Sequence, residues 1–154
     1  GEQTIARQRT VRDAYYQEYL RTESIEIEGV VETLAELSKF ARMAIVTTAK
    51  RGDFHIIHEK RRISQFMDFV LAREDYTLAK PHPEPYLTGL DRLGASREET
   101  LIVEDSARGL RSAVAAGIDC AVVHNEFTKG QDFSGAAYRI QTLAELKEVI
   151  LNRT

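Results

Sequence analysis

Short apolar runs of β-prone residues recur along most of the chain and alternate with segments of helical periodicity. Each run is continuously apolar, which is typical of strands that are buried on both faces of a parallel sheet. The runs lie at residues 44–47, 69–71, 101–103 and 120–123, with a weaker one at 138–140. This pattern predicts an open α/β sandwich, in which a parallel sheet lies between two layers of helices.

Capping residues mark the helices between these runs. Apolar residues at steps of three and four after Gly29 predict one helix, and a Thr-Leu-Ala-Glu capping box at residues 142–145 opens the last one. Residues 3–20 carry apolar side chains at near-helical spacing, which predicts a partly amphipathic helix. The other helix starts and stops are expected near Gly52, Pro83, Ser106, Gly94 and Gly117.

The charge balance excludes several classes of protein. The 154 residues include 21 Lys and Arg against 24 Asp and Glu, a net charge of −3. Such a chain has no net positive field to gather a nucleic-acid backbone or an anionic membrane, and no apolar run approaches the about 20 residues that span a bilayer. The single cysteine, Cys120, indicates a reducing compartment. We therefore expect a cytoplasmic protein without a nucleic-acid or membrane partner.

Polar side chains follow three of the predicted strands, at the edge where open parallel sheets bind ligands. Thr47 and Thr48 end the first run, and Lys80 lies in the loop after the second. Glu104 and Asp105 end the third. Two adjacent carboxylates favour a hard divalent cation such as Mg²⁺, while the hydroxyls and the ammonium would neutralise and orient a phosphate. The N-terminus of the following helix would favour the same anion.

These strand ends and their neighbours resemble motifs of the haloacid dehalogenase superfamily, and more narrowly of its phosphoglycolate phosphatase and β-phosphoglucomutase branch. The resemblance extends from about Ile25 to the C-terminus. It implies that Thr47 hydrogen-bonds the transferring phosphoryl group and that Lys80 holds the nucleophile and phosphoryl oxygens. It also implies that Asp105, assisted by Glu104, binds Mg²⁺. The matching segments are AIVTT at 44–48, KPHPEPY at 80–86 and VEDS at 103–106, followed by Gly109, Ala113, Ala116 and Gly117.

The resemblance implies a three-layer, Rossmann-like core and a Mg²⁺-dependent phosphatase that hydrolyses a small phosphorylated metabolite through a phospho-aspartate. The family's nucleophile belongs to an Asp-x-Asp motif that ends the first strand, in the middle of the sheet. This sequence contains no Asp-x-Asp. We therefore expect the central strand to be absent, with residues 25–154 forming the α/β core and residues 1–24 forming the last helix of a helical cap domain.

We expect such a chain to be the C-terminal part of a longer enzyme and to be inactive alone. An empty strand position would invite pairing in a homodimer or with a missing N-terminal segment. A phosphomutase is an alternative, and so is a non-catalytic module that binds phosphate or metal without the nucleophile. A phospho-receiver domain combines similar residues, but its acidic pair ends the first strand, whereas Glu104 and Asp105 follow Lys80.

Overall fold

A six-stranded parallel sheet forms the centre of the protein. The computed structural model describes residues 13–16, 29–58, 63–126 and 128–153. Within them, the strand order is β3-β2-β1-β4-β5-β6, and every neighbouring pair runs parallel. The predicted runs therefore correspond to five of these six strands. The strands are β1 (Asp13–Tyr16), β2 (Arg42–Val46), β3 (Val70–Leu71), β4 (Thr100–Glu104), β5 (Asp119–Val123) and β6 (Tyr138–Ile140).

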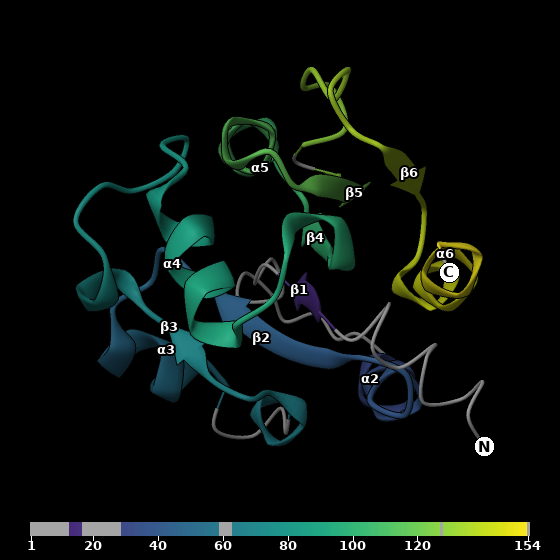
Figure 1. The fold of residues 1–154 in the computed structure, drawn as a ribbon, viewed down its shortest axis with the longest axis horizontal. Helices are drawn as coiled ribbons and strands as arrows, with labels where there is room; N and C mark the ends of the chain where they lie inside the picture. Colours follow the sequence, from purple (N-terminus) through teal and green to yellow (C-terminus); the bar gives the residue numbers. More distant parts are fainter. Residues whose placement is uncertain (1–12, 17–28, 59–62, 127, 154) are drawn as a thin grey trace.

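Helices cover both faces of this sheet. The described α-helices are α2 (Val30–Leu37), α3 (Arg51–His58), α4 (Glu84–Leu93), α5 (Ala107–Ala116) and α6 (Leu146–Asn152), with 3₁₀ turns η2 (Ser64–Phe66), η3 (Arg73–Asp75), η4 (Arg97–Glu99) and η5 (Leu143–Glu145). Figure 1 shows α4 and α5 on one side of the sheet and α2 and α6 on the other.

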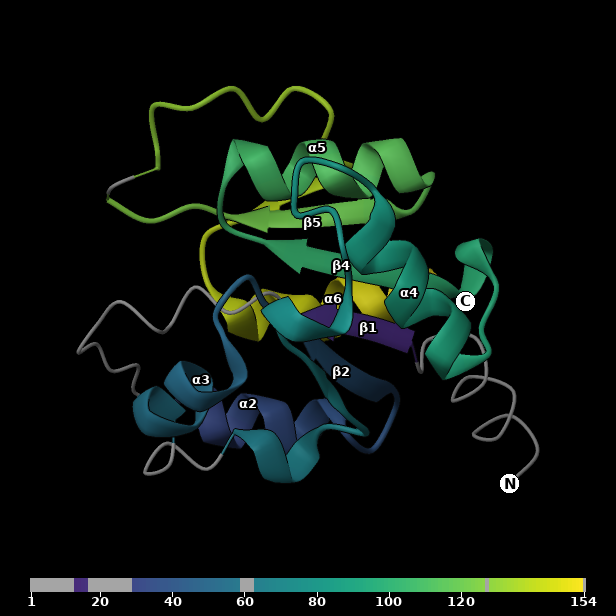
Figure 2. The same cartoon turned by 90° about the vertical axis from the view of Figure 1, so that its left-hand side faces the viewer.

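Two buried apolar clusters fill the spaces between the layers. One includes Leu34 of α2 and Ile150 of α6, and the other includes Tyr86 of α4 and Leu110 of α5. Figure 2 shows α5 and α2 on opposite sides of the strands. The predicted α/β sandwich with three layers is thus confirmed. In the described part of the chain, none of the helices combines the length and the apolar character needed to cross a membrane.

The helix ends follow from the capping residues that the sequence places there. Gly94 and Gly117 have φ angles of 69° and 75° after α4 and α5, a left-handed conformation that glycine adopts without steric cost. The Ser106 hydroxyl accepts a hydrogen bond from the Gly109 amide at 3.1 Å and so caps α5. The Thr142 amide donates to Glu145 Oε2 at 2.8 Å in the predicted capping box.

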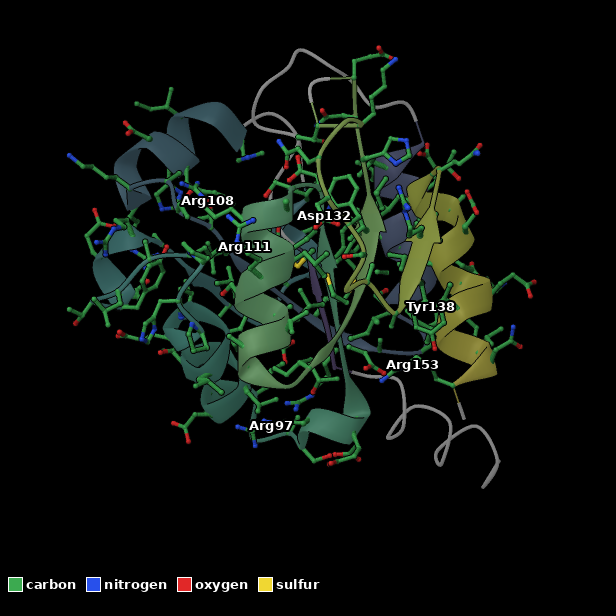
Figure 3. All side chains as sticks on the ribbon, turned by 90° about the horizontal axis from the view of Figure 1, so that it is seen from above. Arg97, Arg108, Arg111, Asp132, Tyr138 and Arg153 are labelled. Atoms are coloured by element: carbon green, nitrogen blue, oxygen red, sulfur yellow. The ribbon has the colours of Figure 1, made fainter. Side chains whose placement is uncertain are left out.

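Two arginines fasten the edge of the sheet at which β4 and β5 begin. Arg97 Nε donates to the carbonyl oxygen of Ala116, the last residue of α5, at 2.7 Å. Arg153 Nη1 lies 3.0 Å from Asp119 Oδ2 at the start of β5. Figure 3 shows both arginines away from Arg108, which lies near the start of α5. These contacts belong to the framework, because the carboxyl ends of the strands lie at the opposite edge.

The centre of the sheet differs from the sequence-based expectation. Asp13–Tyr16, predicted to be helical, forms β1 between β2 and β4, with Tyr16 level with Ile45 and Val103. The expectation of an absent central strand is therefore wrong for this chain. Both neighbouring strands would otherwise carry unpaired backbone groups, and tyrosine suits a strand. The rest of the expected helix and of the cap assignment, residues 1–12 and 17–24, lies outside the described residues, and there the domain division stays a prediction.

Candidate functional site

Lys80 connects the carboxyl ends of β2 and β4. Its ammonium donates to the carbonyl oxygen of Val46, the last residue of β2, at 3.1 Å. It also donates to Oε2 of Glu104, the last residue of β4, at 2.7 Å. Because β1 lies between β2 and β4, the lysine side chain reaches across one strand position. The structure thus brings Lys80 and Glu104 together, as expected for residues at one edge of a parallel sheet.

Water scarcely reaches the ion pair of Lys80 and Glu104, whose side chains are 2% and 1% exposed. Burial lowers the pKa of Lys80 from its usual value, because desolvation of the ammonium outweighs the attraction of the Glu104 carboxylate. Each of the two buried charges is therefore stabilised mainly by the opposite charge of its partner. The pair carries no net charge, and the Lys80 ammonium is directed to Val46, Tyr86 and Glu104. Its contact with phosphate stays a prediction.

Tyr86 completes this buried network from α4. Its hydroxyl donates to Oε2 of Glu104, and the Lys80 ammonium donates to the same hydroxyl at 3.2 Å. The ammonium also lies 4.7 Å from the centre of the Tyr86 ring, within the range of a cation–π contact. Burial and the nearby Glu104 charge raise the pKa of Tyr86 well above its usual value. The phenol therefore stays protonated and can donate to the carboxylate.

Gly109 allows α5 to approach the Glu104 carboxylate. A Cβ atom at position 109 would lie 1.9 Å from Glu104 Oε1, far inside any van der Waals contact. The absence of a side chain is therefore required by packing, and the Gly109 of the sequence motif has a physical role. The carboxylate of Glu104 is enclosed by Lys80 and Tyr86 on one side and by the α5 backbone on another.

Thr47 lies at the end of β2, beside this network, and is fully buried. Its amide donates to the Leu71 carbonyl oxygen at 2.9 Å, and its carbonyl oxygen accepts a hydrogen bond from the Tyr76 hydroxyl at 2.8 Å. Its own hydroxyl accepts from the Ala49 amide at 3.1 Å, which leaves the hydroxyl proton to be donated. Thr48 is half-buried. The phosphate-binding roles of both threonines stay predictions.

Asp105 is the more accessible of the two predicted metal ligands. It is half-buried, and its Oδ2 accepts a hydrogen bond from Asn125 Nδ2 at 3.2 Å. Glu104, in contrast, directs Oε2 to Lys80. The described residues contain no group of three or more His, Cys, Asp and Glu side chains that could hold a metal. Mg²⁺ usually takes one or two carboxylates and completes its shell with water and phosphate. The residues therefore fit Mg²⁺ through Asp105, with Glu104 next to it.

The first amides of α5 already have protein partners. The Gly109 amide donates to the Ser106 hydroxyl, and the Ala107 amide donates to Gln131 Oε1 at 2.7 Å. An anion that took the hydrogen bond of the Ala107 amide would have to displace the Gln131 side chain. The expectation that this helix N-terminus favours an anion stays a prediction. In this structure the Gln131 side chain accepts from one of the two amides and the Ser106 hydroxyl from the other.

Three residues of this site are missed by sequence reasoning: Tyr86, Asn125 and Gln131. Tyr86 lies in the 80–86 segment, but its position on the apolar face of α4 already explains an aromatic residue there. Asn125 comes two residues after the end of β5, so the rule that points to Asp105 after β4 could have pointed to it as well. Gln131 lies in the middle of a loop, where no local pattern predicts its contact with α5.

The sequence is similar to known hydrolases. The family model for haloacid dehalogenase-like hydrolases matches residues 2–123. A haloacid dehalogenase-like hydrolase domain-containing protein of Arabidopsis thaliana is 31% identical over 137 residues, which are 86% of this chain and 43% of that protein. Protein CbbY of Rhodobacter capsulatus is 33% identical over 124 residues, 75% of this chain and 55% of CbbY. The chain spans about half the length of the curated relatives it matches.

Solved structures share the fold. CbbY from Rhodobacter sphaeroides in complex with phosphate superposes with a TM-score of 0.72 at 27% identity, over 81% of this chain and 58% of that chain. A variant of that protein in complex with xylulose-(1,5)-bisphosphate gives a TM-score of 0.69 at 28% identity, over 77% and 55% of the two chains. Ligands of both complexes carry phosphate.

Proposed function

Because the chain belongs to the haloacid dehalogenase-like hydrolase family, we propose that it provides the phosphate- and magnesium-binding core of a phosphatase acting on a small phosphorylated metabolite. The observation that carries this proposal is the buried pair of Lys80 and Glu104, 2.7 Å apart, at the carboxyl ends of β2 and β4. Glu104 holds the Lys80 ammonium at this edge of the sheet, where a preorganised donor can stabilise the charge of a phosphate.

Each polar group at this edge has a distinct role in the proposal. The Lys80 ammonium and the hydroxyls of Thr47 and Thr48 bind and orient the phosphoryl oxygens. Asp105, with Glu104 beside it, holds Mg²⁺, which when bound supplies positive charge that offsets the charge of the phosphate. Glu104 has a second role, since it holds the Lys80 ammonium in place. Tyr86 fixes that carboxylate in turn.

The sequence lacks the Asp-x-Asp that would supply the attacking carboxylate in this family. Hydrolysis through a phospho-aspartate requires a carboxylate that attacks phosphorus while the bond to the substrate oxygen breaks. The sequence contains no Asp-x-Asp, and β1 is followed by Gln17 and Glu18. We therefore propose that the 154 residues alone bind phosphate without turning a substrate over. A non-catalytic phosphate-binding module is the second candidate, and the lack of Asp-x-Asp is what favours it.

The relatives support a small phosphorylated substrate. Solved CbbY complexes hold phosphate in one case and a sugar bisphosphate in the other. A pyrophosphatase, PpaX of Oceanobacillus iheyensis, is 37% identical over 95 residues, 61% of this chain and 44% of PpaX. A phosphomutase would use the same phosphate cradle, and the described residues contain no contact that distinguishes the two reactions.

Calorimetric titration of the 154-residue chain with inorganic phosphate and Mg²⁺ tests this proposal. We expect binding, loss of binding in Lys80→Ala and in Thr48→Val, and unchanged binding in Lys147→Ala. Lys147 is a suitable control because its ammonium pairs with Glu36 on the surface, at 2.9 Å. Thr48→Val covers the case in which Lys80→Ala unfolds. Absence of phosphate binding would overturn the proposed phosphate site of Lys80, Thr47 and Thr48. Mg²⁺-dependent turnover of p-nitrophenyl phosphate that Lys80→Ala abolishes would overturn the proposed inactivity.

A further inference from the structure

We propose that Asn125 is a positioning residue for Asp105 and that the loop between β5 and β6 holds it in that role. The inference rests on the proposed function, since it concerns the carboxylate assigned to Mg²⁺. Asn125 Nδ2 donates to Asp105 Oδ2 at 3.2 Å, across the carboxyl ends of the adjacent strands β5 and β4. This hydrogen bond restricts rotation of the Asp105 carboxylate.

The orientation of the Asn125 amide is set by Thr128. The Thr128 amide donates to Asn125 Oδ1 at 3.0 Å, and the Asn125 amide donates to Thr128 Oγ1 at 3.0 Å. Because the side-chain oxygen of Asn125 is engaged by Thr128, its NH₂ group is the one that faces Asp105. This reciprocal turn presents a donor, and not an acceptor, to the carboxylate.

A second contact fastens the same loop to the start of α5. Gln131 Oε1 accepts a hydrogen bond from the Ala107 amide at 2.7 Å, two residues after Asp105. The Gln131 amide donates to the Thr128 carbonyl oxygen at 2.9 Å, so the two contacts are linked through Thr128. Beyond Gln131, Phe133 is 2% exposed and packs in the core beside α4 and α5. The loop is therefore anchored on the β4–α5 connection and in the core.

The chemistry of the two acidic residues differs in a way that suits this assignment. Glu104 has its charge met by the Lys80 ammonium. Asp105 receives a hydrogen bond from the neutral amide of Asn125, and this bond orients the carboxylate. Partners that orient metal-binding carboxylates in this way commonly change metal affinity about 10- to 100-fold when removed. Asn125 is thus expected to tune the affinity of Asp105 for a divalent cation without touching that cation.

Mn²⁺ is a suitable probe for the Mg²⁺ site, because electron paramagnetic resonance counts the free ion. We would titrate the 154-residue chain with Mn²⁺ in the presence of inorganic phosphate and record thermal unfolding of each variant. Asn125→Ser removes the donor to Asp105 and keeps an oxygen that can accept from the Thr128 amide. Thr128→Val is the matched control, because it removes only the Oγ1 hydroxyl of the turn and keeps the Thr128 amide that orients Asn125 Oδ1. We expect Asn125→Ser to weaken Mn²⁺ binding about tenfold and Thr128→Val to change it less than about twofold.

A second variant at position 125 should raise the affinity for Mn²⁺ instead of lowering it. Asn125→Asp keeps the acceptor for Thr128 and sets another carboxylate beside Asp105, so Mn²⁺ should bind more tightly than to the wild type. The gain would show that position 125 lies close to the bound cation, while Asn125→Ser and its control test the positioning role. Wild-type affinity in Asn125→Ser, or an equal loss in Thr128→Val, would overturn the inference while Asp105→Asn still abolished binding. If the wild type binds no Mn²⁺, or if Asp105→Asn binds it normally, both the proposed metal site and the inference about Asn125 are wrong.

Discussion

The ammonium of Lys80 lies 2.7 Å from Oε2 of Glu104, and neither side chain exposes more than 2% of its surface. Removing one partner leaves the other as an unpaired buried charge, so we expect Lys80→Met and Glu104→Gln each to lower the free energy of unfolding by about 3–5 kcal/mol. The double variant should lose clearly less than the sum of the two. Urea denaturation of the four proteins measures this coupling, and strictly additive losses would contradict it.

The two buried tyrosines of this region allow a matched comparison. The Tyr86 hydroxyl donates to the charged Glu104 carboxylate, whereas the Tyr76 hydroxyl donates to the neutral carbonyl group of Thr47. Hydrogen bonds to charged groups contribute about 1.5–3 kcal/mol to stability and neutral ones about 0.5–1.5 kcal/mol. Tyr86→Phe should therefore destabilise the protein by about 1 kcal/mol more than Tyr76→Phe in urea denaturation. Equal losses of stability would show that the hydrogen bond to the charged Glu104 stabilises the protein no more than the one to the neutral carbonyl group.

Replacing either of two helical glycines by alanine should change the stability of the protein, in opposite directions at the two positions. At Gly109 a Cβ atom would lie 1.9 Å from Glu104 Oε1, while at Gly52 in α3 it would meet nothing within 4 Å. Gly109→Ala should destabilise the protein by about 1–3 kcal/mol or more, because the buried carboxylate has to move. Gly52→Ala should stabilise it by up to about 1 kcal/mol through its better helix propensity. Thermal unfolding of both variants tests the pair, and a neutral Gly109→Ala would contradict the close packing of α5 on Glu104.

Much of the fold follows from local patterns because buried parallel strands and capped helices leave clear signals. The continuous apolar runs predict β2 to β6, and Gly94 and Gly117 predict where α4 and α5 end. The meeting of Lys80 and Glu104 is also predictable, since parallel strands bring their carboxyl ends to one edge. These features depend on neighbouring residues or on a general rule of the fold, and so the sequence is enough to find them.

Other features depend on contacts between segments that are distant in the sequence. The tyrosine spacing around residues 13–16 locally resembles that of a helix. Asp13–Tyr16 nevertheless forms a strand, because it pairs with both β2 and β4. A strand of four residues is stabilised by such tertiary contacts, which the local sequence does not reveal. The hydrogen bonds from Asn125 to Asp105 and from Ala107 to Gln131 span 20 and 24 positions. No periodic pattern encodes them, so the part played by the β5–β6 loop emerges only from the structure.

Glu84 gives the region before Lys80 a dependence on pH. Its carboxylate accepts hydrogen bonds from the amides of Thr77 at 2.7 Å and Leu78 at 2.9 Å, in the turn that leads to Lys80. These bonds lower the pKa of Glu84 from its usual value of 4.5. A carboxyl group with a lowered pKa stabilises the fold fully above its unfolded pKa, and this contribution is lost as the pH falls through the folded pKa.

Glu84→Gln should therefore be less stable than the wild type near neutral pH, and the difference should shrink as the pH falls below the unfolded pKa of about 4.5. Urea midpoints of both proteins at neutral pH and in this acidic range measure the effect. Glu98→Gln is the control, because it makes the same change on an exposed side chain outside this turn. A Glu84→Gln difference that is independent of pH would mean that the turn before Lys80 is held by other contacts.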